Sequence, residues 1–168
     1  MQFRVAIQED LLEIKSMYLK IIDKMKIDDI KIWDNIYPCE FFDNDIKNKN
    51  LYLLLKNNII VGAFALCKEH SGANAVKWEQ MNAKAVYIDR LGVNIDFCKQ
   101  GIATELLKAA SNMAIENNAE YLRLFVIDFN IPAKNLYEKF GFKQVEGVYK
   151  EVIDETLSFD EFGYEIKL

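Results

Sequence analysis

The segment from Val86 to Leu107 limits the possible folds of this chain more than any other part, because it reads as a strand, a tight loop and a helix. Val86–Val93 is typical of a strand, and Gly101 opens a helical pattern with no acidic residue before Glu105. The first N–H groups of such a helix have no partner within it, and the helix dipole is positive at that end. The glycine and the alanine two positions later let a phosphate approach the backbone closely. We therefore interpret the loop as a pyrophosphate site for a nucleotide-type cofactor.

Length and composition are typical of one globular domain over residues 1–168, with 51% hydrophobic residues available for a core. No apolar run approaches the roughly 18 to 20 residues that a membrane span requires, and the N-terminus lacks the apolar region of a secretory signal. The three cysteines, Cys39, Cys67 and Cys98, form no CxxC pair, and there is one histidine. We expect no disulfide framework and no metal site, and a cytoplasmic location.

The net charge of the chain limits the kinds of partner that it is expected to bind. The net charge is −5 and the isoelectric point is near 5.0, whereas a nucleic-acid-binding domain favours a basic face. We expect no nucleic-acid and no membrane partner. A cationic small molecule or a protein amine is compatible with the acidic balance.

The first half of the chain predicts a strand, helices and a hairpin. Phe3, Val5 and Ile7 alternate with polar residues, as in a strand, and apolar residues at helical spacing follow. A pair of asparagines between two apolar runs is typical of a hairpin turn. The expected elements are a helix over Asp10–Lys26, a second short helix within Asp28–Asn50, hairpin strands Leu51–Leu55 and Ile59–Leu66 around Asn57-Asn58, and a loop over Lys68–Lys84.

The second half continues with alternating helices and strands. A strand that follows the Gly101–Asn117 helix should pair in parallel with Val86–Val93 through a right-handed crossover. Proline is tolerated in the first turn of a helix, and glycine ends one. The expected elements are a strand over Tyr121–Ile127, a short helix from near Pro132 to Phe140-Gly141, last strands Phe142–Tyr149 and Phe162–Leu168, and between these an acidic linker, Glu151–Glu161, with a solvated face.

Two motifs in this order resemble the GCN5-related N-acetyltransferase superfamily. Cys98-Lys-Gln-Gly-Ile-Ala103 resembles the acetyl-CoA loop of that family, Arg/Gln-x-x-Gly-x-Gly/Ala. Asn130-Ile-Pro-Ala133, followed by Leu136-Tyr-Glu-Lys-Phe-Gly-Phe142, resembles its second motif. One short glycine pattern recurs by chance, but both motifs at this separation are a strong match. The resemblance extends from Phe3 to the last strand, although the first third matches only in layout.

The resemblance implies the fold and the activity. The expected fold is the α/β (α+β) acyl-CoA N-acyltransferase fold, with a mixed, mostly antiparallel sheet of about six to seven strands flanked by about four helices. The expected enzyme is an acetyl-CoA-dependent N-acetyltransferase that transfers the acetyl group to a primary amine. Because the sequence offers no positioned nucleophile–His pair, we expect direct attack without a covalent enzyme intermediate. A homodimer is also compatible with the family.

The resemblance also assigns cofactor contacts. Backbone amides would bind the pyrophosphate, main-chain groups of one strand would pair with the pantetheine arm, and the N–H of Val93 would face the thioester oxygen. Cys98 departs from the usual Arg or Gln, so a side-chain contact is lost unless Lys99 or Gln100 replaces it. The implied cofactor residues are Leu91, Gly92, Val93, Lys99, Gln100, Gly101, Ile102, Ala103, Thr104, Asn130 and Tyr137.

The catalytic candidates are Tyr137 and Asp89. Tyr137 matches the general acid of the family, but a phenol with a pKa of about 10 is a weaker acid than a thiol near 8.5. Tyr137 is therefore alternatively a hydrogen-bond donor that stabilises the thiolate. It is also a candidate for a purely structural role, in which its ring packs on Leu136 and Phe140. Asp89 shares a strand face with Tyr87 and Leu91. It is a candidate base, a group that holds a cationic acceptor, or the partner of Arg90 or Arg123 in an ion pair.

The acceptor itself is not identified by the sequence. Aromatic residues in the variable segments are candidates to line the acceptor pocket, and each has core packing as its alternative: Trp33, Tyr37, Phe41, Trp78 and Tyr87. The alternative for Asn130 is a helix cap, and His70 is expected in a solvated loop.

Two rival functions stay open at this point. One is a non-catalytic acyl-CoA-binding or sensing module of the same fold, which the departure at Cys98 favours. The other is an unrelated nucleotide-binding α/β domain. Stabilisation by acetyl-CoA but not by ATP or NAD would distinguish the expected enzyme from the second rival.

Overall fold

The computed structural model describes the whole chain, Met1 to Leu168. It divides into two compact units, residues 1–66 with 90–109, and residues 67–89 with 110–168. The strand β5 (Ala85–Val93) and the helix α3 (Ile102–Glu116) each contribute residues to both units. The single domain expected over residues 1–168 stays a prediction.

The first unit contains three consecutive antiparallel strands and the end of β5. β1 (Gln2–Val5) pairs with β2 (Leu51–Lys56), and β2 pairs with β3 (Ile59–Cys67). Asn57 and Asn58 join β2 to β3 with φ angles of 52° and 63°. Asparagine tolerates this left-handed conformation, which a two-residue hairpin turn requires, so the predicted hairpin is confirmed.

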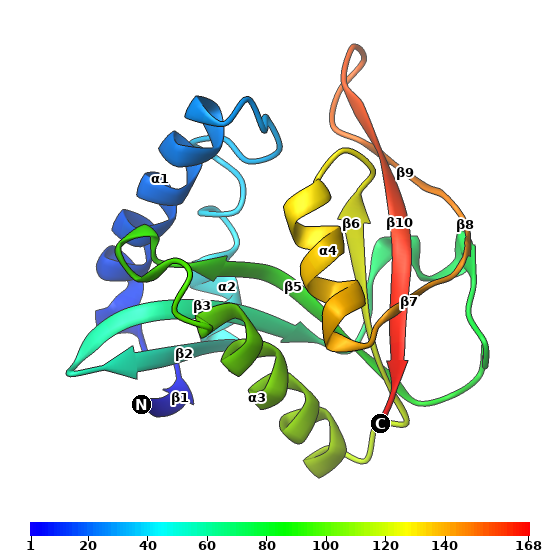
Figure 1. The fold of residues 1–168 in the computed structure, drawn as a ribbon, viewed down its shortest axis with the longest axis horizontal. Helices are drawn as coiled ribbons and strands as arrows, with labels where there is room; N and C mark the ends of the chain where they lie inside the picture. Colours follow the sequence, from blue (N-terminus) through cyan, green and yellow to red (C-terminus); the bar gives the residue numbers. More distant parts are fainter. The chain divides into compact units, whose positions relative to one another are not determined.

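The helices of the first unit enclose its core. α1 (Leu11–Ile27) follows a short 3₁₀ turn, η1 (Gln8–Asp10), and α2 (Phe42–Lys47) is the expected second helix. Figure 1 shows α1, in blue, beside the green turn that carries η3 (Ile95–Phe97), in agreement with the contacts between them. The large side chains buried in this unit come from helices and strands alike: Ile14, Tyr18, Ile22, Phe42, Leu51, Leu53, Phe64, Leu106 and Leu107.

The second unit contains a mixed set of strands. The first part of β5 pairs in parallel with β6 (Tyr121–Ile127), as expected for a strand–helix–strand unit. β10 (Ser158–Lys167) pairs antiparallel with β6, β7 (Lys143–Gln144) and β9 (Tyr149–Val152), and a small separate sheet joins β4 (Val76–Lys77) to β8 (Glu146–Gly147). Six of the seven pairs described within the units are antiparallel, so the mixed, mostly antiparallel sheet and the four α-helices are confirmed.

The helix α4 (Ile131–Phe140) lies beside β10 in Figure 1. The hydroxyl of Tyr164 on β10 donates to Glu138 at 3.0 Å, and the Lys134 ammonium lies 5.0 Å from the centre of the Phe162 ring. Gly141 ends the helix with a φ of 117°, a conformation that favours glycine.

Three predicted segments differ from the structure. The expected loop Lys68–Lys84 contains the turn η2 (Ser71–Asn74) and β4, and the expected strand Phe142–Tyr149 is broken into β7, β8 and the start of β9. Two-residue strands are too short to show a period-2 pattern. The expected acidic linker Glu151–Glu161 forms most of the β9–β10 hairpin, and Glu161 is buried rather than solvated.

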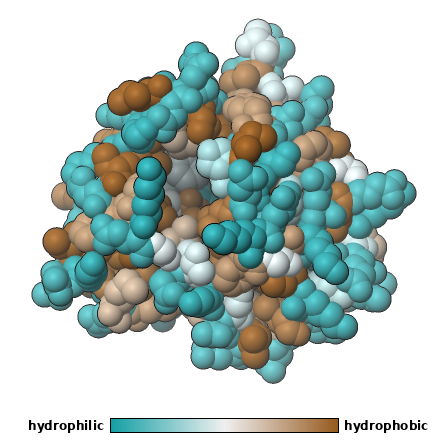
Figure 2. All heavy atoms as spheres, in the orientation of Figure 1, coloured by the Kyte–Doolittle hydropathy of each residue, from teal (hydrophilic) through white to brown (hydrophobic).

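The surface in Figure 2 is mainly hydrophilic, and hydrophobic residues are interspersed among the polar ones. No helix combines the length and the hydrophobicity that crossing a lipid bilayer would require.

Candidate functional site

The loop before α3 exposes unpaired backbone N–H groups. The first hydrogen bond of α3 runs from the amide of Glu105 to the carbonyl of Gly101 at 3.1 Å. The amides of Ile102, Ala103 and Thr104 therefore have no acceptor within the helix. Gly101 has a φ of 79° and open space where a side chain would begin. This geometry provides several N–H donors at the positive end of a helix dipole, which suits an anion.

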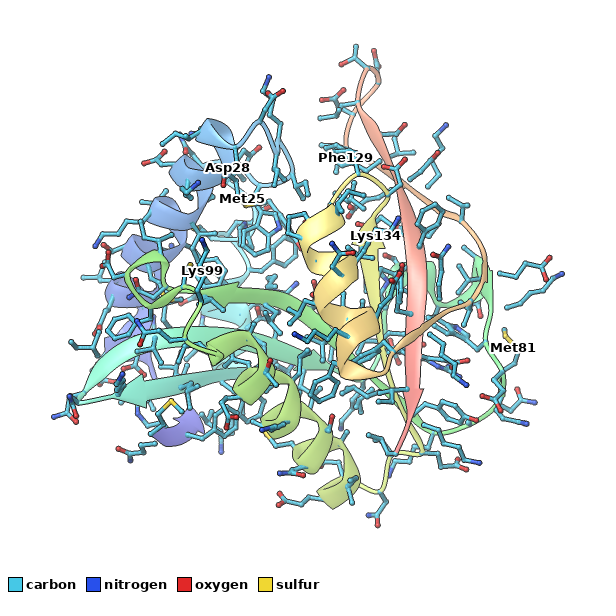
Figure 3. The ribbon with its side chains drawn as sticks, in the orientation of Figure 1. Met25, Asp28, Met81, Lys99, Phe129 and Lys134 are labelled. Atoms are coloured by element: carbon cyan, nitrogen blue, oxygen red, sulfur yellow. The ribbon has the colours of Figure 1, made fainter.

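Lysine side chains add positive charge to this loop. Figure 3 shows Lys99 in this loop. Its φ is 61°. Lys56 at the end of β2 donates to the side chain of Gln100 at 3.4 Å and lies 5.8 Å from the centre of the Phe97 ring. Lys56 is distant in sequence, so the sequence analysis missed it. The Glu105 carboxylate is bound to Lys108 at 2.9 Å, which reduces its repulsion of an anion.

Cys98 is exposed at the start of the loop, and its thiol lies 3.8 Å from the carbonyl oxygen of Asn94. No arginine or glutamine occupies this position, but Lys99 within the loop and Lys56 beside it are cations that suit a phosphate contact. A diphosphate fits the combination of free amides, open space at Gly101 and two lysines.

The strand β5 has a local irregularity at Arg90, immediately before Leu91. Arg90 has a φ of 52°, which a non-glycine residue adopts only when its surroundings hold it there. Its buried guanidinium binds both carboxylate oxygens of Asp45 at 2.9 Å and lies over the Phe41 ring. Its carbonyl accepts the hydroxyl of Tyr18 at 2.5 Å.

Gly92 is required for the same arrangement. A methyl group at Gly92 would lie 2.8 Å from the Tyr18 ring, so only glycine allows this contact. The half-buried residues Leu91 and Val93 flank it on β5. The Tyr18, Asp45 and Arg90 contacts thus fix the backbone of the strand segment to which the sequence analysis assigned cofactor contacts.

Tyr137 and Asp89 both belong to the second unit. Tyr137 on α4 is 9% exposed, and its ring packs edge-on against Phe142 at 5.9 Å. Its hydroxyl makes no hydrogen bond to the protein. Burial first, and then the charge of Asp89, raises the pKa of Tyr137 well above its ordinary value. The phenol therefore stays neutral and acts as a hydrogen-bond donor at any ordinary pH.

Two ion-pair partners considered for Asp89 are bound elsewhere. Arg90 binds Asp45, and Arg123 binds Glu165 at 3.1 Å in the core of the second unit. The charge of Asp89 also acts on Tyr137 and on two further acids, Glu151 and Glu161.

Glu151 and Glu161 are residues that the sequence analysis did not assign to the site. Burial raises the pKa of Glu161 to about 8, and the neighbouring Glu151 and Asp89 add to the shift. Burial also raises the pKa of Glu151. Their sequence context is only a weak indication of a site, because both acids lie in a polar run that resembles a solvated segment.

The aromatic candidates divide between core and half-buried positions. Trp78 is 5% exposed, donates to the Ala73 carbonyl at 2.7 Å and holds the Arg123 guanidinium 4.4 Å from its ring centre, so it is a core residue of the second unit. Tyr87 is buried beside it. In the first unit, Trp33 packs on Tyr18 and Tyr37 packs on Phe41, each at 5.5 Å.

His70 and Asn130 occupy ordered positions. His70 was expected to be solvated, but its ring stacks on Phe125 at 4.4 Å and its Nδ1 accepts the Gly72 amide at 3.0 Å. That expectation was wrong because aromatic partners distant in sequence cover the loop. Asn130 caps α4 by accepting the Ala133 amide at 3.3 Å, the alternative that the sequence analysis gave for it.

The α/β fold and the loop over residues 98–104 (the anion-binding loop) suit an enzyme with a phosphate-bearing co-substrate. The chain belongs to the Acetyltransferase (GNAT) family, whose model matches residues 16–142. It is an N-acetyltransferase that depends on acetyl-CoA, so the family and the enzyme class expected from the sequence are confirmed.

Individual relatives agree with this assignment. The chain is 30% identical over 125 residues to the N-alpha-acetyltransferase of Saccharolobus solfataricus, which covers 73% of this chain and 74% of that protein. The structure resembles a GNAT-family acetyltransferase of Listeria monocytogenes 4b F2365, with a TM-score of 0.76, 19% identity and coverage of 99% and 94%. It also resembles the ribosomal-protein-alanine N-acetyltransferase of Brucella melitensis, with a TM-score of 0.73, 17% identity and full coverage of both chains. These two structures show the shared fold.

Proposed function

We propose that this enzyme acetylates the α-amine at the amino terminus of a peptide or protein. The observation that supports this acceptor is the similarity to the N-alpha-acetyltransferase of Saccharolobus solfataricus, at 30% identity over most of both chains. The chemistry is also favourable, because an α-amine has a pKa of about 8 and a lysine side chain about 10.4. An α-amine therefore loses its proton more easily before it attacks.

The cofactor contacts in this proposal are those of the anion-binding loop and β5. The amides from Lys99 to Thr104, with Lys56 as an added cation, bind the diphosphate of coenzyme A. Main-chain groups of Leu91 and Val93 pair with the pantetheine arm as an added strand would, and the Val93 N–H polarises the thioester carbonyl. The amine attacks that carbonyl directly.

Tyr137 and Asp89 complete the proposed chemistry. Because its phenol stays neutral, Tyr137 donates a hydrogen bond that stabilises the leaving thiolate. Asp89 is coupled to Tyr137 and attracts the positively charged amine of the acceptor.

The acceptor is tested with acetyl-CoA, a library of short peptides that differ in their first residues, and a matched panel of lysine peptides blocked at the amino terminus, diamines and polyamines. Mass spectrometry should find acetylation at the α-amine of free peptides. Acetylation confined to lysine side chains or polyamines would refute the proposed acceptor. Tight acetyl-CoA binding without turnover of any amine would instead favour a sensing module of the same fold.

The role of Tyr137 is tested by Tyr137→Phe, which removes only the hydroxyl. We expect kcat to fall by about 10- to 100-fold, since one hydrogen bond to a developing charge is lost, with little change in the KM for acetyl-CoA. Tyr164→Phe is the matched control, because its hydroxyl also contacts α4 but is already bonded to Glu138 and Gln144. That control should keep kcat; a large KM change with unchanged kcat in Tyr137→Phe would contradict the role.

A further inference from the structure

Glu161 is the exception among the buried carboxylates of this chain. It is 9% exposed and lies within no ion pair. The other buried carboxylates each bind an arginine, in the pairs Asp10–Arg4 at 2.6 Å, Asp45–Arg90 at 2.9 Å and Glu165–Arg123 at 3.1 Å. Burying a carboxyl group without a cation is unfavourable, so the position of Glu161 calls for a functional explanation.

The groups that face Glu161 are acids and rings rather than bases. On β9, Tyr149 is its direct cross-strand neighbour and Glu151 the diagonal one, on the same face of the sheet. The proximity of Glu151 contributes to the raised pKa of Glu161, which burial causes in the first place.

The neighbouring elements contribute a further acid, an apolar residue and the titratable ring of His70. β5 contributes Asp89, and β6 places Ile127 opposite Glu161. On β10 itself, Glu165 lies on the same face of the sheet as Glu161, but it is bound to Arg123. The ring of His70 stands edge-on to Tyr149, with ring centres 5.9 Å apart.

Tyr137 provides an independent observation at this place. The residue is 9% exposed, its hydroxyl makes no hydrogen bond to the protein, and the charge of Asp89 acts on both Tyr137 and Glu161. A neutral donor and a buried carboxyl group, both close enough to one aspartate to feel its charge, can serve as the acid and the base of one reaction.

We propose that Glu161, with Glu151 diagonally across from it on β9, accepts the proton of the incoming amine. This inference rests on the proposed function, because it assigns the base of that same reaction. The ammonium form of the acceptor gives one proton to the Glu161 carboxylate. The C–N bond then forms as the C–S bond breaks, and the second N–H proton of the amine moves to the sulfur of coenzyme A. Glu161 returns its proton to solvent through Glu151.

The acid strength of the pair suits this task. A carboxyl with an ordinary pKa near 4 is a poor acceptor for an ammonium proton, whereas Glu161, with a pKa of about 8, is matched to an α-amine and to a neutral working pH. Asp89 then keeps the role of attracting the cation.

The test measures rate against pH from 6 to 10 with two reactions. One is acetylation of an alanine-initiated tetrapeptide at saturating acetyl-CoA. The other is the slow hydrolysis of acetyl-CoA by the enzyme, corrected for the uncatalysed rate, in which water replaces the amine and no amine titrates. The wild-type rate should rise with an apparent pKa near 8 in both reactions.

Three variants separate the base from a structural carboxyl. Glu161→Gln should abolish the rising limb of the hydrolysis reaction and lower kcat/KM for acetylation at pH 8.5 by about 10²-fold or more. Glu151→Gln should keep activity but move the limb to lower pH, because the neighbouring acid no longer raises the pKa of Glu161. The matched control is Glu155→Gln, which replaces an exposed acid at the tip of the same hairpin. It should change neither the rising limb nor kcat/KM. Unchanged binding of acetyl-CoA confirms that each variant is folded.

The outcomes distinguish this inference from the proposed acceptor. If Glu161→Gln retains the rising limb in the hydrolysis reaction, or Glu151→Gln leaves that limb in place, Glu161 is not the base, whatever the acceptor is. If no peptide is acetylated but the hydrolysis limb responds to both variants as expected, the acceptor is wrong and Glu161 remains the base. An enzyme that neither acetylates nor hydrolyses refutes both.

Discussion

The buried pair of Arg90 and Asp45 is the residue-scale feature that most directly shapes β5. Both side chains are 6% exposed, and Asp45 satisfies the guanidinium with two hydrogen bonds. The hydroxyl of Tyr18 binds the Arg90 carbonyl, so the two sides of one residue are held by different helices. A positive φ at a non-glycine residue costs about 1–3 kcal/mol, and these contacts offset it.

Asp45→Asn tests this arrangement. The change keeps the shape of the side chain but leaves the Arg90 charge buried without its partner, so we expect the free energy of unfolding to fall by about 3–5 kcal/mol in urea titrations. Because Leu91 follows Arg90, the KM for acetyl-CoA should rise as well. Asp43→Asn is the control, since it removes an exposed ion pair with Lys47 on the same helix. If the free energy of unfolding falls no more in Asp45→Asn than in that control, the Arg90–Asp45 pair does not hold β5 in place.

At the scale of elements, the N-terminus of α3 is left without acidic residues until Glu105, which is itself bound to Lys108. An acid in the first turn would stabilise the helix by about 0.3–1 kcal/mol. The same charge would repel a diphosphate. A helix end that binds an anion must therefore lack this stabilising acidic residue, as α3 does.

Ala103→Glu therefore has two effects of opposite sign. The melting temperature of the free enzyme should rise slightly, because the new carboxylate interacts with the positive helix end, while the KM for acetyl-CoA should rise by about 10-fold or more through repulsion of the phosphates. Asn112→Glu, an exposed position within the same helix, is the control for charge alone. Thermal melts and initial rates at low salt measure both effects. Tighter acetyl-CoA binding by Ala103→Glu would rule out an anion site at this helix end.

Elements defined by local chemistry could be predicted from the sequence. The Asn57-Asn58 hairpin, the proline near the start of α4 and the glycine after its end each act within a few residues, and all three are confirmed. The parallel pairing of β5 and β6 followed from the helix between them. The irregularity at Arg90 and the burial of Glu161 could not be predicted, because each depends on partners tens of residues away. The same holds for Lys56 beside the anion-binding loop.

At the scale of the whole molecule, the buried acids make stability depend on pH. The pKa of Glu161 rises from an ordinary 4.5 to about 8 in the folded chain. Between these values the folded state holds a proton that the unfolded state has lost, so stability decreases as pH rises and the loss is complete above pH 8. Asp10 acts in the opposite direction. Its hydrogen bond with Arg4 lowers its pKa, and the stability it provides is lost as pH falls through that lowered value.

Stability and activity should therefore have different pH optima. Urea titrations of the wild type should give the largest free energy of unfolding near pH 5 and a value lower by a few kcal/mol, in order of magnitude, at pH 8.5. Glu161→Gln cannot ionise, so its free energy of unfolding should change less over this range and exceed that of the wild type at pH 8.5, where its acetylation rate is lowest. An enzyme that retains an unpaired acid in its interior loses stability at the pH where that acid works. If Glu161→Gln is less stable than the wild type at pH 8.5, the carboxyl serves packing, and the trade-off between stability and activity at this residue does not exist.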